Sequence, residues 1–278
     1  MKNLFNENMK SFSKNWKIIM VKFILLILGI LLTSFGLALY QQPSVGGSQI
    51  DWLIYNVLSI SIPFVKEGKV GQGVYDNYAI SLTTLYIVLI LFAICFSIKP
   101  TIDEYKKTKS KSAWFKFSWF ILADIIITFI VPQIVGLFIT PLSQMGIREL
   151  IPGARNLIFI AGFLCFVLGI AFWVKSGWLL GPFNNICEQF LRLTKMNYSK
   201  GRLIIDIAIL IIAFAFFPFV KGEGASKTDF LLTNFGLGTI CFTFLVGPLV
   251  NQILIILDKV FDYKKMNNKE DIVVNKEL

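Results

Sequence analysis

The sequence contains no histidine, and only 16% of its 278 residues are charged. The absence of histidine excludes histidine-based acid–base catalysis, histidine-containing triads and histidine-ligated zinc. Average domains carry about 25% charged residues, so this chain is poor in charge for its length. The patterns GxGxxG, Walker A, GxSxG and HExxH are also absent. We therefore expect no enzymatic activity and no bound cofactor.

Cysteine is scarce, with four residues that stand alone in the sequence: Cys95, Cys165, Cys187 and Cys241. Their spacing fits neither a disulfide framework nor a metal site, so we interpret them as small packing residues and expect no metal. The net charge of +10 invites a nucleic-acid interpretation. We reject it, because the basic residues lie at the ends of apolar runs, where they orient a protein in a membrane.

What the sequence has in abundance is long apolar runs, since 55% of its residues are hydrophobic. Six runs are about 18 residues or longer, which is enough for a helix to cross a hydrocarbon core of about 30 Å. The runs are 23–40, 77–98, 117–139, 156–174, 203–220 and 230–257. The fold class predicted is therefore all-α: a polytopic membrane protein with six transmembrane helices. Its first partner is the lipid bilayer.

Two shorter apolar elements, at residues 51–64 and 183–193, are predicted to be re-entrant or interfacial helices. With six crossings, 21 of the 27 lysine and arginine residues fall on one side, including the six lysines of the 99–116 loop. The positive-inside rule then places both termini in the cytoplasm. If the short elements also crossed, that six-lysine loop would move outside.

The chain divides into five segments on this interpretation. They are an amphipathic cytoplasmic segment (1–17), a first membrane repeat (18–140), an external loop (141–155), a second repeat (156–258) and a polar cytoplasmic tail (259–278). In the first segment Phe5, Met9, Phe12 and Trp16 form one apolar stripe beside lysines, which suits an anionic membrane surface. An ordinary extension of the first membrane helix is the alternative.

The two membrane segments share a pattern that predicts an inverted repeat. Gly29 to Tyr40 and Gly162 to Trp173 both fit G-x6-G-[LI]-A-[LF]-[YW], at an offset of 133. Each is followed by a turn-rich stretch, a short element and two long apolar runs. Because each unit has three crossings, the second is upside down relative to the first, as in many secondary transporters. A chance match between two glycine-bearing runs is the alternative.

Glycines and prolines mark the expected helix breaks. Phe235-Gly-Leu-Gly-Thr239 can start a helix, with the threonine capping free N–H groups. Pro248, later in the same run, removes a backbone donor, and Pro132 does so near the end of the first repeat. The set of expected helix-break positions is Pro132, Gly181, Pro182, Gly238 and Pro248.

These motifs resemble the YczE/YyaS/YitT-type bacterial integral membrane proteins. The residues that carry the resemblance are Gly236-Leu-Gly-Thr with Leu245-Val-Gly-Pro248, Gly36-Leu-Ala-Leu-Tyr with Val45-Gly-Gly-Ser48, and Gly169-Ile-Ala-Phe-Trp with Leu180-Gly-Pro182. The chain departs from the family at residues 63–77, which are longer and more polar. The resemblance implies a bacterial inner-membrane protein that is sometimes labelled a permease.

Asp124 is the principal candidate for function, because an acid near the centre of a membrane helix costs on the order of 3 kcal/mol to insert. It is either an ion, proton or substrate contact, or a protonated or snorkelling residue at a packing site. Asp206 lies only one turn inside its run and is expected to be a hydrated helix-end residue.

The other candidates are polar residues at the edges of the apolar runs. Glu188 and Arg192 are spaced to pair on one helix face, and they form a polar cluster with Asn184 and Asn185. That cluster is either a contact site or a self-satisfied interfacial helix. The candidate substrate or ion contacts are Asp124, Asp51, Asn184, Asn185, Glu188, Asn251 and Gln252. Asn251 and Gln252 are expected to replace the partner that Pro248 removes, and Asp51 is expected to face Asn185 across the repeat axis.

Two functions follow from these observations. The first is a permease-like protein that moves a small solute, with proton coupling through Asp124. The alternative is a non-transporting accessory or scaffold protein that binds lipid, a protein partner or a second copy of itself. The sequence does not name the solute.

Overall fold

A computed structural model describes residues 2–61, 72–220 and 225–263. Over these residues the chain is helical, with no strand. The helices are α1 (Lys2–Gln41), α2 (Gln49–Ser61), α3 (Gln72–Thr108), α4 (Ser112–Ser143), α5 (Pro152–Ser176), α6 (Gly181–Thr194), α7 (Tyr198–Phe216), α8 (Ala225–Asn234) and α9 (Leu237–Val260), with short 3-10 turns at Ile147–Glu149 and Phe217–Phe219. Phe5, Met9 and Phe12 of the predicted stripe, and the tail from residue 264, lie outside the described side chains.

Six stretches are long and apolar enough to cross a membrane, as predicted. They lie in α1, α3, α4, α5, α7 and the combined α8–α9 segment. Many large apolar side chains on these helices are exposed, including Leu137 and Leu157, as expected for helices that face lipid rather than water. The chain is therefore an all-α polytopic membrane protein.

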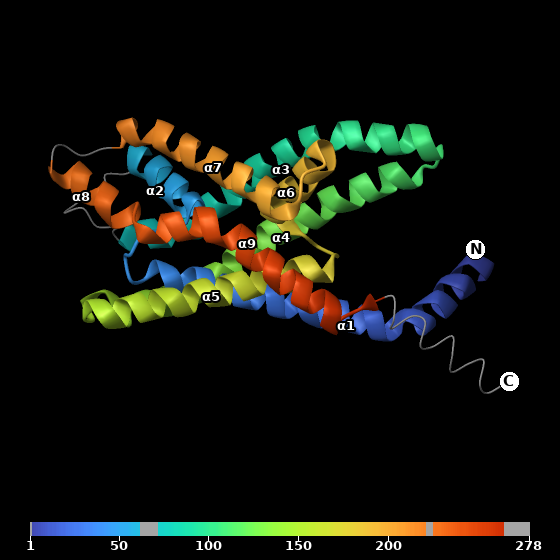
Figure 1. The fold of residues 1–278 in the computed structure, drawn as a ribbon, viewed down its shortest axis with the longest axis horizontal. Coiled ribbons are helices and arrows are strands. Elements are labelled where there is room, and N and C mark those ends of the chain that lie inside the picture. Colours follow the sequence, from blue (N-terminus) through green and yellow to red (C-terminus); the bar gives the residue numbers. More distant parts are fainter. Residues whose placement is uncertain (1, 62–71, 221–224, 264–278) are drawn as a thin grey trace.

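α1 and α5 are packed at backbone contact along much of their length, as the ribbon shows (Figure 1). A Cβ atom added to Gly29 would lie 2.5 Å from the backbone nitrogen of Trp173, and one added to Gly162 would lie 2.6 Å from that of Tyr40. Only glycine allows so close an approach, which is the packing role of small residues in membrane helices. The contacts pair rising numbers in α1 with falling numbers in α5, so the two helices are antiparallel.

The contacts between helices occur in corresponding pairs. Gly29 meets Trp173 while Tyr40 meets Gly162, and each position in one contact is 133 residues from its counterpart in the other. The same holds between helices: α2 packs on α7 and α3 on α6, while α1 packs on α4 and α5 on α9. The α1–α5, α2–α7 and α3–α6 contacts join the two halves in a reciprocal manner, whereas α1–α4 and α5–α9 are corresponding contacts within each half.

The two short helices form at the predicted places and are largely buried. Trp52 and Asn56 of α2 are at most 5% exposed, and so are Ile186 and Cys187 of α6. α2 packs against α7, and α6 packs against α3 and α4. The polar first turns of both short helices are thereby kept away from lipid, where unpaired backbone groups are costly.

The prolines do not break their helices, which corrects the prediction for Pro132 and Pro248. α4 continues through Pro132, and α9 continues through Pro248. A proline removes one backbone hydrogen bond, and the surrounding turns hold the helix on either side. The last apolar run is interrupted instead between α8 and α9, next to Gly236. Gly181 and Pro182 open α6, and Gly238 lies in the first turn of α9.

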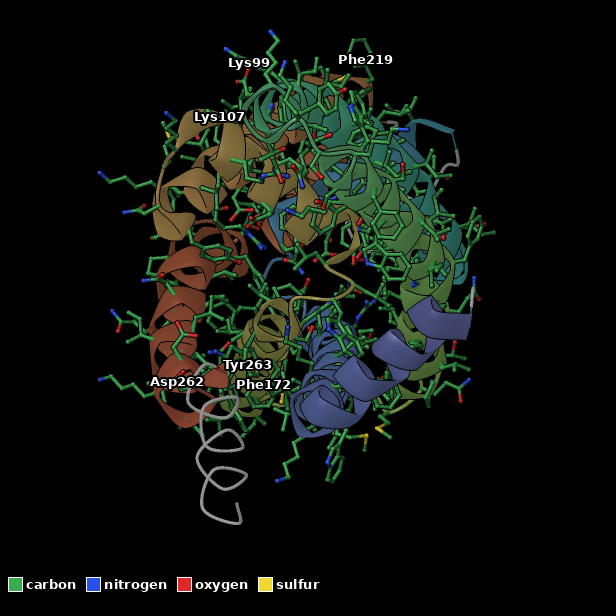
Figure 2. The ribbon with its side chains drawn as sticks, turned by 90° about the vertical axis from the view of Figure 1, so that its right-hand side faces the viewer. Lys99, Lys107, Phe172, Phe219, Asp262 and Tyr263 are labelled. Atoms are coloured by element: carbon green, nitrogen blue, oxygen red, sulfur yellow. The ribbon has the colours of Figure 1, made fainter. Side chains whose placement is uncertain are left out.

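The start of α1, the end of α9 and the α3–α4 turn lie toward the same end of the molecule (Figure 1). Figure 2 looks onto this end, where Lys99 and Lys107 lie on one side and Asp262 and Tyr263 on the other. The Tyr263 ring lies 5.0 Å from the amine of Lys22 and 4.5 Å from that of Lys175, and so connects α1 with α5. That this end faces the cytoplasm stays a prediction.

Candidate functional site

The first polar centre is Asp51, in the first turn of α2. Ser48 and Asp51 form a capping box: the Asp51 backbone N–H donates to Ser48 Oγ at 3.2 Å, and the Ser48 N–H donates to Asp51 Oδ2 at 2.8 Å. The carboxylate also accepts from the hydroxyl of Ser48 at 2.7 Å, from Tyr40 at 2.6 Å, from the amide of Gln41 at 2.8 Å and from the hydroxyl of Tyr78. Asp51 thus joins the end of α1, the start of α2 and α3.

Two of the motifs that define the family resemblance contact each other beside this centre. Gly238 donates its N–H to the carbonyl of Val45 at 3.1 Å, and the Thr239 hydroxyl donates to the carbonyl of Gly47 at 2.7 Å. A Cβ added to Gly46 would lie 2.7 Å from the nitrogen of Gly236. Thr239 was expected to cap α9, and this is wrong, because its hydroxyl binds the 45–47 turn instead. The glycine-rich start of α9 therefore holds the turn that leads into α2.

The second polar centre is Asp124, at the middle of α4. Its Oδ2 accepts from the Asn185 amide at 2.5 Å, and the Asn185 oxygen accepts from Gln189 at 2.8 Å. The Gln189 oxygen in turn accepts from Arg192 at 3.1 Å. Asp124, Asn185 and Gln189 are each at most 4% exposed, whereas Arg192 reaches the surface. The chain of hydrogen bonds therefore links a buried carboxylate to a cation at the end of α6.

Arg192 pairs with Glu104 of α3 at 3.0 Å, and Glu104 also pairs with Lys116 of α4 at 2.8 Å. The predicted pair of Glu188 with Arg192 is wrong, because Glu188 is exposed and Arg192 turns toward α3. In this position Arg192 contacts both Glu104 and Gln189, whereas a pair with Glu188 would give it one partner. The Asp124 chain therefore ends at an ionic link among α3, α4 and α6.

The third polar centre is a buried ion pair in α7. Arg202 lies 3.1 Å from Asp206, and the two side chains are 2% and 0% exposed. The Gln49 amide, from the first turn of α2, donates to Asp206 Oδ1 at 2.6 Å. The guanidinium also lies 4.1 Å from the centroid of the Phe183 ring. Asp206 was expected to be hydrated, and this is wrong: α2 and α6 cover it and exclude water.

A central cavity of about 40 Å³ lies between the two halves. Residues from α1 to α6 line it, and its polar members are Thr33, Ser34, Tyr40, Ser48, Tyr86 and Asn184. A water molecule needs about 10–15 Å³ on this measure, so the cavity holds a few water-sized atoms at most. The first residues of α2 and of α6 both reach it, so the two short helices begin at one shared space.

A smaller cavity of about 10 Å³ adjoins the Asp124 centre. Asp124, Asn185, Gln189 and Arg192 line it together with residues of α3. Its size suits about one water molecule. The Asp124 carboxylate can therefore form a hydrogen bond with a water molecule in this cavity.

The remaining predicted residues lie elsewhere. Asn251 is half-buried and Gln252 exposed, and neither forms a hydrogen bond with the described residues, so they do not replace the partner lost at Pro248. Asp51 and Asn185 bind different neighbours rather than each other. The described residues include no cluster of three or more acidic, cysteine or histidine side chains that could hold a metal ion.

Fold and site together define an integral membrane protein in which the N-terminal turns of two short internal helices contain or contact buried carboxylates. A family model described as a family of unknown function, DUF6198, matches residues 20–254. The match covers most of the chain, which therefore belongs to this family. No curated protein and no solved structure matches it.

Proposed function

We propose that this protein is a permease that moves a small solute across the bacterial cytoplasmic membrane, with proton coupling through Asp124. The observation that carries the proposal is the shared cavity at which α2 and α6 begin. Transporters with inverted repeats bind their substrates where broken or short helices meet between the halves. The reciprocal contacts of α1 with α5 support such a repeat.

Asp124 suits a coupling role because of what surrounds it. Its only described side-chain partner is a neutral amide, which can stay bonded whether the carboxyl group is ionised or protonated. Gain or loss of a proton at Asp124 would also change the electrostatic environment of Arg192, because the amides of Asn185 and Gln189 connect the two by hydrogen bonds in series. The ionic link to Glu104 would then respond to the charge of Asp124.

The test is solute uptake by proteoliposomes containing the full-length protein. A panel of small anions, amino acids, sugars and polyols is screened at several pH values against empty vesicles. Wild-type protein should accelerate the uptake of at least one solute, and the rate of uptake should depend on pH. Asp124→Asn should lose the pH dependence, whereas Asp103→Asn, an exposed acid on α3, should behave as wild type. Identical pH responses in Asp124→Asn and wild type would remove the coupling role.

A second candidate function, that of a non-transporting accessory protein, is favoured by an apolar groove of about 590 Å³ between α3 and α7. Leu85, Phe92 and Ile212 are among the residues that line it, with α2 and α6 at its base. A groove of this kind suits a helix of a membrane partner. Co-purification of a stoichiometric partner, with no solute flux from the whole panel, would favour this function over transport.

A further inference from the structure

Asp51 differs from the buried acid of α7 in having no cationic partner within residues 2–61, 72–220 and 225–263. Asp206 is paired with Arg202, whereas Asp51 receives its hydrogen bonds from tyrosine, serine and glutamine groups alone. Asp51 is 0% exposed. Buried charges in proteins are generally paired with an opposite charge or coordinate a metal ion. The environment of Asp51 therefore lacks one positive charge.

The central cavity lies beside this carboxylate and presents lone pairs. Tyr40 and Ser48 both line the cavity, and each donates its one hydroxyl hydrogen to Asp51. A hydroxyl group has a single hydrogen and two lone pairs. These two oxygens can therefore only accept from, or coordinate to, an occupant of the cavity.

Three further residues that line the cavity each have a side-chain oxygen with no hydrogen-bond partner among the described residues. Asn184 Oδ1 can only accept, and the Ser34 and Thr33 hydroxyls are also unpaired. The three side chains are 7%, 0% and 7% exposed respectively. The Asn184 amide nitrogen already donates to the carbonyl of Leu180, so its oxygen is the group that remains for an occupant. Unsatisfied buried polar atoms of this kind cost about 1–3 kcal/mol each when nothing binds them.

We infer that the central cavity binds one dehydrated monovalent cation, of the sodium or potassium class, with Asp51 as its counter-charge behind Tyr40 and Ser48. Hard cations prefer oxygen ligands, and a carboxylate that orients the direct ligands tunes such a site. The cavity volume of about 40 Å³ admits a bare ion and not a hydrated one. The inference deepens the proposed transport function, on which the cation's role as a second coupling ion, beside the proton at Asp124, rests.

The N-termini of the two short helices oppose the binding of a cation. A helix N-terminus carries a partial positive charge of about half an elementary charge, which opposes a cation. At α2 the capping box with Asp51 offsets it. At α6 Pro182 lacks an N–H and removes one of the donors. The carboxylate therefore leaves the cavity with a net preference for positive charge.

The experiment is thermal unfolding of the purified full-length protein in chloride salts of sodium, potassium or N-methyl-D-glucamine at equal ionic strength. A ligand that binds only the folded state raises the midpoint with its concentration. Sodium or potassium should raise it in a saturable manner, and the bulky organic cation should not. Equal effects from all three salts would overturn the inference, because the cavity would then hold water only.

Ser34→Ala tests the site itself, with Ser59→Ala as its control. Both serines are fully buried and unpaired, but Ser59 does not line the cavity. Loss of one ligand should raise the half-saturating concentration about threefold to tenfold in Ser34→Ala and leave Ser59→Ala unchanged. An unchanged response in Ser34→Ala would place the ion elsewhere and overturn the inference.

A second pair of variants covers the case in which Ser34→Ala does not fold. Asn184 and Asn56 each donate to a backbone carbonyl and each leave the side-chain oxygen unpaired, but only Asn184 lines the cavity. Asn184→Leu should therefore lose the cation response, whereas Asn56→Leu should keep it. Cation-dependent stability without solute flux would support this site and refute transport. Flux that is independent of sodium and potassium would support transport and refute this site.

Discussion

Substitution of Gly162 by alanine tests the contact on which the two halves depend. The added Cβ would lie 2.6 Å from the backbone nitrogen of Tyr40 and 3.0 Å from its Cα and Cβ. Favourable contacts between carbon atoms occur at about 3.5–4.0 Å, so α1 and α5 would have to separate by about 1 Å. The groups in the way are backbone atoms, which cannot rotate aside as the end of a side chain can.

Two opposing effects set the magnitude. Replacing glycine by alanine within a helix gains about 0.5–1 kcal/mol from reduced freedom of the unfolded chain. Overpacking costs about 1–3 kcal/mol, and a backbone contact belongs at the upper end of that range. The net loss should be about 1–2 kcal/mol, or a fall in midpoint of about 2–8 °C for a domain of this size.

Gly153 provides the matched control, because it lies in the same helix and an added Cβ there would meet nothing within 4 Å. Thermal unfolding, followed by tryptophan fluorescence in detergent, should show Gly153→Ala at or above the wild-type midpoint and Gly162→Ala clearly below it. Gly29→Ala, the counterpart in α1, should match Gly162→Ala. Equal midpoints for Gly162→Ala and Gly153→Ala would refute the close packing of α1 on α5.

Three further predictions concern the charged centres and the orientation. Arg202→Met and Asp206→Leu should each cost about 3–5 kcal/mol in thermal unfolding, and the double variant much less, because each single change leaves an unpaired buried charge. Asp51→Asn should lower the midpoint more than Asp103→Asn, since an amide cannot accept from all the donors around Asp51. In a cysteine-free background, a membrane-impermeant maleimide should reach Lys107→Cys from the cytoplasmic side and Met145→Cys from outside. Both side chains are exposed, and labelling from the same side would overturn the orientation.

The helices could be predicted from the sequence because each depends on a local pattern. Apolar length is a property of one segment, so the six long helices and both short ones formed where expected. The 133-residue offset likewise pointed to Gly29 and Gly162, which lie at the α1–α5 contact. The interruption at Gly236 was also visible as a glycine-rich turn. The predicted breaks at Pro132 and Pro248 were wrong, because the loss of one backbone hydrogen bond does not end a helix that neighbouring helices support.

The site was harder to predict, because its partners come from distant parts of the chain. Tyr78 binds Asp51, and Glu104 binds Arg192, across 27 and 88 residues. No local spacing signals such pairs. The Ser48–Asp51 capping box and the Arg202–Asp206 pair have local spacings that could have been recognised in the sequence, but neither was predicted. The error at Asp206 was to infer burial from distance along the helix, whereas α2 and α6 decide it.

The backbone contacts of the two halves correspond more closely than their chemistry does. At the 133-residue offset Tyr40 corresponds to Trp173, Ser48 to Gly181 and Asp51 to Asn184. One half therefore brings two hydroxyl groups to the central cavity, with a carboxylate behind them, and the other brings an indole, a glycine and a neutral amide. If the chain served only to pack helices, such unequal polarity at corresponding buried places would gain nothing, because burial of polar groups costs desolvation free energy that apolar residues do not. The asymmetry is concentrated where the short helices begin, as expected for a site that holds a single occupant.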